Sequence, residues 1–200
     1  MRLASFWIAG FAFLLALSAC KKSGSGALEA DTNNSSALFV AVPEEKTGIR
    51  FVNELSLSGE FDVFRYRNYY NGGGVAIGDI NNDGRPDVFL TSNQGENRLF
   101  LNKGNFAFED ITAKAGVAGT RAWSTGVAMA DVNGDGLLDI YVCNSGDVKG
   151  DDKENELFIN NGDLTFTEKA REYGLADKGF STHAVFFDFD RDGDLDCYVL

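Results

Sequence analysis

The sequence predicts an all-β fold built from repeated four-stranded antiparallel sheets. Three observations predict this class. One pattern of residues returns three times, each copy contains short apolar runs of strand length, and Asn/Gly or Asp/Gly turn residues separate those runs. With 44% hydrophobic residues among 200, 17 of them phenylalanine, the chain has enough apolar side chains to bury a core.

The repeat is clearest around three acidic segments. Its copies are GVAIGDINNDGRPDVFL (74–90), GVAMADVNGDGLLDIYV (126–142) and AVFFDFDRDGDLDCYVL (184–200). The leading aspartates Asp79, Asp131 and Asp188 are 52 and 57 residues apart. Helical and leucine-rich solenoids have shorter repeats and need helix-period apolar stripes, which this pattern lacks.

Each repeat is expected to contain four short strands. The first uses small and β-branched residues, and the second is continuously apolar, as in strands covered on both faces. The third ends in a turn of the Asn/Gly type that closes hairpins, and the fourth alternates apolar and polar residues, which suits an outer edge. The first copy places these strands at 73–79, 87–90, 98–102 and 106–112.

Four antiparallel strands in every 52 to 57 residues describe a β-propeller blade, with Phe and Tyr packed between neighbouring blades. From Gly48 to Leu200 the chain holds fewer than three repeats, so we expect an incomplete ring in this chain. We favour the interpretation that it is the N-terminal portion of a longer protein. The segment Ile49 to Phe51 is expected to be the fourth strand of a blade and to close a complete ring.

The beginning of the chain is expected to be an export signal followed by a tether. The expected organisation is a lipoprotein signal peptide at 1–19, a flexible Ser-, Gly- and Asn-rich tether at 20–41, and propeller repeats at 42–200. The apolar stretch from Phe6 to Ala19 has 14 residues, too few to span a bilayer.

The residues LSAC, which end at Cys20, resemble a bacterial lipobox. This resemblance implies cleavage before Cys20 and durable attachment to a membrane through lipid on that residue. We therefore expect an exported, lipid-anchored protein of the bacterial cell envelope, with the outer membrane as its site. The alternative is an ordinary secretory signal with a coincidental cysteine.

The acidic segments share the pattern D-x-[N/D]-x-D-G-x-x-D. Side-chain oxygens at positions 1, 3, 5 and 9, a carbonyl at position 7 and a glycine at position 6 suit Ca²⁺. Two carboxylates about 5 Å apart repel by about 3 kcal/mol at an effective dielectric of about 20, and a cation reverses that sign. The expected ligands of up to three Ca²⁺ ions are Asp79, Asn81, Asp83, the Arg85 carbonyl and Asp87; Asp131, Asn133, Asp135, the Leu137 carbonyl and Asp139; and Asp188, Asp190, Asp192, the Asp194 carbonyl and Asp196.

Two other kinds of loop share part of this pattern. Asp/Gly and Asn/Gly pairs can simply make tight turns, which explains one copy more readily than three. An EF-hand begins in the same way but needs Glu at position 12. Here position 12 is Leu90, Val142 or Val199, inside an apolar strand.

The overall charge and the single histidine limit the possible functions. A net charge of -12 repels nucleic-acid phosphates, so no nucleic-acid partner is expected. His183 occupies the position of Gly74 and Gly126 in the other copies, and no oriented base or acid pair is visible. We expect a binding protein. The alternative is a propeller-type polysaccharide lyase or hydrolase acting on extracellular glycans.

The sequence leaves two alternatives open for the roles of the aromatic cluster and of the two cysteines. Trp123 and the cluster FRYRNYY (64–70) are expected in the core between blades, or else as carbohydrate-stacking aromatics. Cys143 and Cys197 are expected to be buried thiols, and a disulfide is possible in an exported protein.

GVAIGDINNDGRPDVFLTS and its second copy resemble the FG-GAP or VCBS repeats of bacterial surface proteins, which are related to the calcium loops of integrin α-chain propellers. With LFLNKGNFAFEDITAKAGV, the sequence is especially similar to the cartilage acidic protein and ASPIC/UnbV group. The resemblance covers about three quarters of the chain. It implies calcium-stabilised blades and adhesion to, or recognition of, a protein or glycan. The ASPIC/UnbV segment that follows the propeller in that group is absent from this sequence.

Overall fold

The computed structural model of the chain describes residues 38–57, 62–121, 123–146 and 153–200. The chain divides into two compact units, Met1–Ala41 and Val42–Leu200, and every helix and strand described belongs to the second. The expected signal peptide and Cys20 lie outside the described residues. In the described ranges, no helix has the length and apolarity that crossing a membrane requires.

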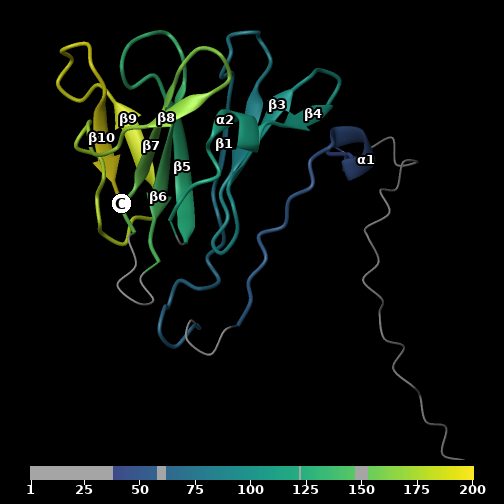
Figure 1. Cartoon of the computed structure of the whole chain (residues 1–200), viewed down its shortest axis with the longest axis horizontal. Helices are drawn as coiled ribbons and strands as arrows, with labels where there is room; N and C mark the ends of the chain where they lie inside the picture. The colour runs from purple at the N-terminus through teal and green to yellow at the C-terminus, as the bar shows by residue number, and fades with distance from the viewer. Residues whose placement is uncertain (1–37, 58–61, 122, 147–152) are drawn as a thin grey trace, which may run out of the picture. The chain divides into compact units, whose positions relative to one another are not determined.

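Strands in the second unit form three antiparallel sheets, which we call blades 1, 2 and 3 (Figure 1). Blade 1 has the order β1 (Val75–Gly78), β2 (Asp87–Leu90), β3 (Arg98–Asn102) and β4 (Phe108–Asp110). Blade 2 has the order β5 (Ser124–Ala130), β6 (Asp139–Asn144), β7 (Glu156–Asn160) and β8 (Phe166–Glu168). Blade 3 pairs β9 (Ala184–Phe187) with β10 (Asp196–Val199). The predicted all-β class and four-stranded units are confirmed, and the sheets are consistent with propeller blades.

The three blades repeat one hydrogen-bonding register as well as one sequence. The first and second strands pair at equivalent positions, namely Ile77 with Val88, Met129 with Ile140, and Phe186 with Cys197. The first strands also lie next to one another, with β5 in contact with β1 on one side and β9 on the other. The blades therefore succeed one another around their innermost strands.

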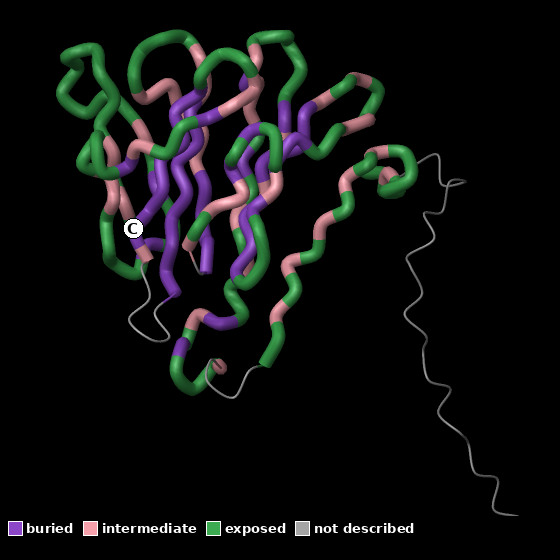
Figure 2. The backbone as a smooth tube through the Cα atoms, in the orientation of Figure 1, coloured by how far each residue is buried: buried purple, intermediate pink, exposed green. Residues whose placement is uncertain are grey.

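Side chains pack between successive blades, as predicted. Phe89 and Leu99 of blade 1 belong to the same buried cluster as Ile140 and Phe158 of blade 2. Between blades 2 and 3, Tyr141 meets a blade 3 ring, Phe186, edge to face, with 5.6 Å between ring centroids. Figure 2 shows these buried stretches running along the strands, with exposed loops at their ends.

The second strands are covered to different extents. In β6 every residue is buried, because β6 belongs to the middle blade and has a sheet against each face. In β2 buried residues alternate with half-buried ones, and in β10 half-buried residues alternate with exposed ones. The prediction that second strands are covered on both faces is therefore confirmed for the middle blade alone.

Two four-residue helices, α1 (Glu44–Thr47) and α2 (Thr112–Ala115), were not predicted. Each ends at a left-handed glycine, Gly48 (φ 72°) or Gly116 (φ 74°). The residues after Gly48 therefore correspond to those after Gly116. In blade 1 those residues follow the fourth strand, β4, and are not part of it. The prediction of a strand at Ile49 to Phe51 is wrong, since within the described ranges these residues form no strand and pair with none.

Three of the aromatic residues, Tyr66, Tyr69 and Trp123, form a buried cluster, whereas Phe64 and Tyr70 are exposed. Trp123 is 2% exposed and contacts Tyr66 and Tyr69, with ring centroids 5.3 and 5.1 Å away. The two cysteines are both free thiols, so no disulfide joins them. Burial raises the pKa of Cys143 to about 12, which makes this thiol unreactive.

Candidate metal centres

The three acidic segments form loops of one kind at one edge of the blades. Loop 1 (79–87), loop 2 (131–139) and loop 3 (188–196) each join the first strand of a blade to its second (Figure 1). Position 12 of each pattern lies in β2, β6 or β10. This strand-loop-strand arrangement excludes the helix-loop-helix of an EF-hand.

In loops 1 and 2 the chain folds around the carboxylate at position 1. Asp79 accepts hydrogen bonds from the backbone N–H groups of Asp83 (3.1 Å) and Gly84 (2.6 Å). Asp131 accepts the equivalent bonds from Asp135 (3.0 Å) and Gly136 (2.8 Å). A carboxylate has about four lone-pair sites, so these bonds leave capacity for a metal ion.

Positions 3 and 5 are also brought together in these two loops. The Nδ2 of Asn81 donates to Asp83 over 3.1 Å, and the Nδ2 of Asn133 donates to Asp135 over 2.8 Å. The glycine at position 6 has positive φ in every loop, 81° at Gly84, 86° at Gly136 and 98° at Gly193. In loops 1 and 2 this turn accompanies hydrogen bonds that join position 5 to positions 1 and 3.

The carboxylate at position 9 joins the loop to the sheet. The two oxygens of Asp139 accept the N–H groups of Val132 (2.9 Å) and Asn160 (2.8 Å), and Asp87 binds Ile80 and Asn102 in the same way (3.0 and 2.7 Å). Both carboxylates are buried. Burial raises the pKa of each, although these hydrogen bonds partly oppose the rise.

Sequence reasoning missed the asparagines that end the third strands. Asn102 donates its Nδ2 to the carbonyl of Pro86 (2.8 Å), and Asn160 donates to Leu138 (3.1 Å) and, in the neighbouring blade, to Ile80 (2.8 Å). They therefore support the loop next to them. These asparagines could have been found from the sequence, because RLFLN and ELFIN both end in Asn.

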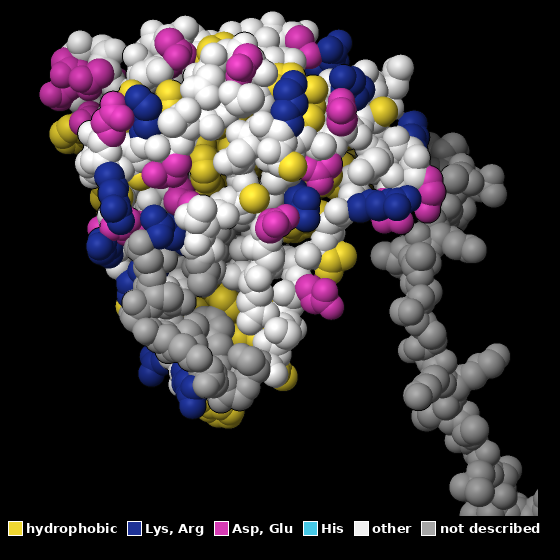
Figure 3. Space-filling model, in the orientation of Figure 1, with side chains coloured by type: hydrophobic (Ala, Val, Ile, Leu, Met, Phe, Trp, Pro, Cys, Tyr) yellow, Lys and Arg dark blue, Asp and Glu magenta, His cyan; other side chains and the backbone are white. Residues whose placement is uncertain are grey.

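Loop 3 brings carboxylates closest together. One oxygen from each of Asp188, Asp190 and Asp196 lies within 4.8 Å of the others. Figure 3 shows acidic side chains gathered over this loop at the upper left. The charge of Asp192 raises the pKa of Asp194. Such crowding of like charges favours a divalent cation.

Loop 1 differs in one charged contact. The guanidinium of Arg85 lies 2.6 Å from the Asp83 carboxylate. Burial opposes ionisation of Asp83, but hydrogen bonds from Asn81 and Arg85 and the arginine charge together hold its pKa below the usual range. A cation in loop 1 must therefore compete with Arg85. The donors in all three loops are oxygens, so the residues fit a hard cation such as Ca²⁺.

In each of the three stacked sheets, an acidic loop of the same pattern joins the first strand to the second. This arrangement defines the class of the protein as a blade-forming repeat protein with acidic loops. The chain belongs to the FG-GAP-like repeat family, whose model matches residues 79–142 and 145–199, more than half of its length. Repeats of this family are typical of propellers that serve protein recognition and adhesion.

The chain is similar in sequence to cartilage acidic protein 1 from three animals. The chain is 35% identical to the Xenopus tropicalis protein and 33% identical to the Mus musculus protein, each over 135 residues and about two thirds of this chain. Identity to the Homo sapiens protein is 41% over 76 residues. The match spans only about a fifth of the frog and mouse relatives, 20% of each.

Proposed function

We propose that this chain is a calcium-binding lipoprotein of the cell envelope whose blades recognise a protein or a glycan. The convergence of Asp188, Asp190 and Asp196 within 4.8 Å carries the calcium part of this proposal. Three Ca²⁺ ions would change the formal charge from -12 to about -6. Calcium suits these loops better than Mg²⁺ because it accepts more oxygen ligands in a flexible geometry.

Calcium titration of the full chain tests the metal sites. We expect up to three bound ions by calorimetry, and stabilisation of about 2.7 kcal/mol per site when free calcium is about one hundred times Kd. Replacing Asp188 and Asp190 by Asn should remove one site and leave the others. Glu45→Gln, an exposed acid outside the loops, is the control for a loss of charge. An unchanged number of bound ions in the double variant would contradict the assignment.

A binding role is supported over catalysis by the surroundings of His183. In the ranges that the structure describes, no hydrogen bond joins its imidazole to a carboxylate, so no oriented acid-base pair is formed there. The aspartates of the loops bind backbone amides and converge on a metal position. We therefore propose retention of a ligand without its chemical conversion.

The free face of blade 1 supports a larger ring. An apolar groove of about 650 Å³ there is lined by residues that include Ile77, Pro86 and Val88. Their equivalents in blade 2, which include Met129 and Leu138, are the residues that blade 1 covers, since both lie against Gly78. We propose that another blade of the same type covers this groove in the complete protein.

The membrane anchor rests on the lipobox resemblance at Cys20. Metabolic labelling in a bacterial host with an alkyne fatty acid should label the wild-type chain and leave Cys20→Ser unlabelled. The labelled chain is expected in the membrane fraction, and the variant in the soluble fraction, because acyl chains provide the attachment. Equal labelling of the two chains would contradict this anchor.

A further inference from the structure

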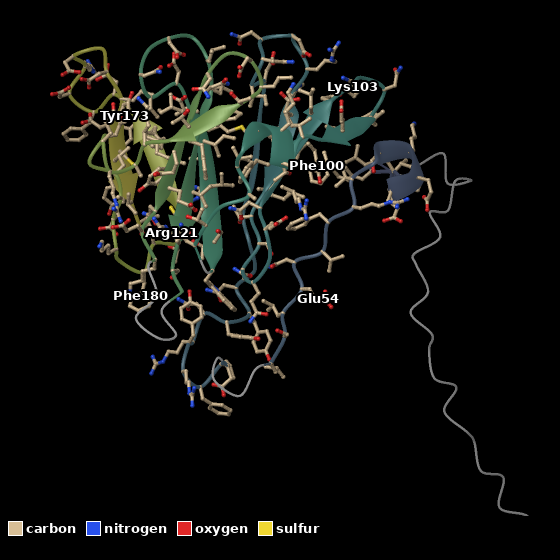
Figure 4. The ribbon with its side chains drawn as sticks, in the orientation of Figure 1. Glu54, Phe100, Lys103, Arg121, Tyr173 and Phe180 are labelled. Carbon is tan, nitrogen blue, oxygen red and sulfur yellow. The ribbon has the colours of Figure 1, made fainter. Side chains whose placement is uncertain are left out.

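A second site lies at the opposite end of the blades from the acidic loops. An open cavity of about 340 Å³ is lined there by the segment before β1, the start of β5 and the residues before β9. We call it the inner-end cavity. Figure 4 labels Phe180, which lies at this end of the sheets, away from the loops. Three segments more than 50 residues apart in sequence thus build one cavity.

Contacts between blades fix the walls of the inner-end cavity. The hydroxyl of Thr91 donates to the carbonyl of Thr125, and the hydroxyl of Thr125 donates to the carbonyl of Ser181 (2.7 Å). Tyr66, which lines the cavity, packs on Trp123 and donates its hydroxyl to Ser145 (2.8 Å). The cavity is therefore formed before any ligand arrives, which lowers the entropic cost of binding.

The lining residues carry neutral polar groups. No Asp, Glu, Lys or Arg is among them. The side-chain amides of Asn68 and Asn71 have no hydrogen-bond partner among the described residues, and the imidazole of His183 has none there either. Each amide offers both donors and an acceptor. A ligand rich in neutral hydroxyl groups, each also donor and acceptor, matches this lining.

The position of His183 indicates that its side chain does more than fill space between blades. Its equivalents Gly74 and Gly126 are glycines because a Cβ would meet the next blade, at 2.7 Å from the Thr125 carbonyl in the first case. At Gly126 the added Cβ would lie 2.8 Å from Nδ1 of His183. The glycine therefore makes room for the imidazole, which lines the inner-end cavity and is itself exposed.

We propose that the inner-end cavity binds a neutral saccharide, with Asn68, Asn71 and His183 donating and accepting hydrogen bonds to its hydroxyl groups. A volume of about 340 Å³ is at the small end for ligand pockets and admits roughly one or two sugar rings. This inference rests on the proposed recognition function. It assigns a binding site for the case in which the recognised ligand is a glycan.

Saturation-transfer-difference NMR of the full chain in calcium tests the site. The probes are the methyl glycosides of glucose, galactose, mannose and N-acetylglucosamine, with glucuronic acid as a charged probe. We expect signals from at least one neutral probe and none from glucuronic acid. Asn71→Ala and His183→Ala should each weaken binding about three- to tenfold, the effect of losing one hydrogen bond. Asn161→Ala, an exposed amide in the β7–β8 turn, should bind as the wild type does.

The outcomes distinguish this site from the broader function. Neutral sugar binding that both cavity variants leave unchanged would overturn the site, and so would preferred binding of glucuronic acid. If none of the four glycosides binds while the chain is still retained on immobilised polysaccharide or protein, the cavity assignment fails and the recognition function stands. If one of the methyl glycosides is hydrolysed, the proposed binding function fails instead. Calcium stoichiometry and thermal unfolding of each variant show whether its fold is intact.

Discussion

Replacing Asp139 by alanine is expected to lower the free energy of unfolding by about 2–5 kcal/mol, because one buried and one half-buried N–H group lose their acceptor. Those groups belong to Val132 and Asn160, which bind the two oxygens of this carboxylate (2.9 and 2.8 Å). Urea denaturation in a calcium chelator measures the effect separately from metal binding.

Asp135→Ala is the matched control for Asp139. Asp135 is exposed and accepts bonds from Leu137 and Asn133 within its own loop (2.9 and 2.8 Å). We expect this variant to lose calcium affinity but less than about 1 kcal/mol of stability in chelator, as for other exposed hydrogen bonds. If Asp139→Ala is destabilised only when calcium is present, position 9 acts through the metal and not as a link between loop and sheet.

Gly126→Ala is expected to destabilise the protein by about 2–3 kcal/mol, the usual cost of overpacking. The added Cβ would meet the carbonyl oxygen of Thr182 and lie 2.9 Å from the Cα of His183. Since these atoms belong to the next blade, the blades must move apart. Thermal or urea unfolding measures the loss.

Gly134→Asn is the matched control for this glycine. Gly134 has φ 73° and nothing within 4 Å of an added Cβ, and its equivalent in loop 1 is Asn82 with φ 57°. Asparagine tolerates this conformation, so the free energy of unfolding should change by less than about 0.5 kcal/mol. Gly126 itself has no left-handed φ, so the loss expected there comes from contact alone. A Gly126→Ala variant no less stable than Gly134→Asn would show that contact between blades does not make Gly126 necessary.

The sequence predicted the strands well because their signals are local. The apolar runs at 87–90 and 139–142 and the pattern RLFLN each mark a strand in the structure. The four-residue helices escaped prediction because one helical turn is too short to show a periodic stripe. The strand predicted at Ile49 to Phe51 failed because Gly48 was not recognised as the glycine that ends such a helix.

The acidic loops were predictable as candidates, but their connections were not. The pattern gives positions 1, 3, 5 and 9, and the structure brings the first three together within each of loops 1 and 2. The bonds from Asn160 to Ile80 and from Asn82 to Gly136 link loop 1 to blade 2 (2.8 and 2.9 Å). Contacts between segments 54 and 80 residues apart have no signal in a local pattern.

The backbones of β1, β5 and β9 nearly touch where Gly74 and Gly126 lie, because a glycine presents no side chain there. Farther from these strands, large side chains such as Phe158 and Phe166 occupy the space between sheets. Each blade is consequently a wedge, thin along the inner strands and thick toward the rim. The difference in residue size between the inner strands and the rim thus sets the angle between neighbouring sheets.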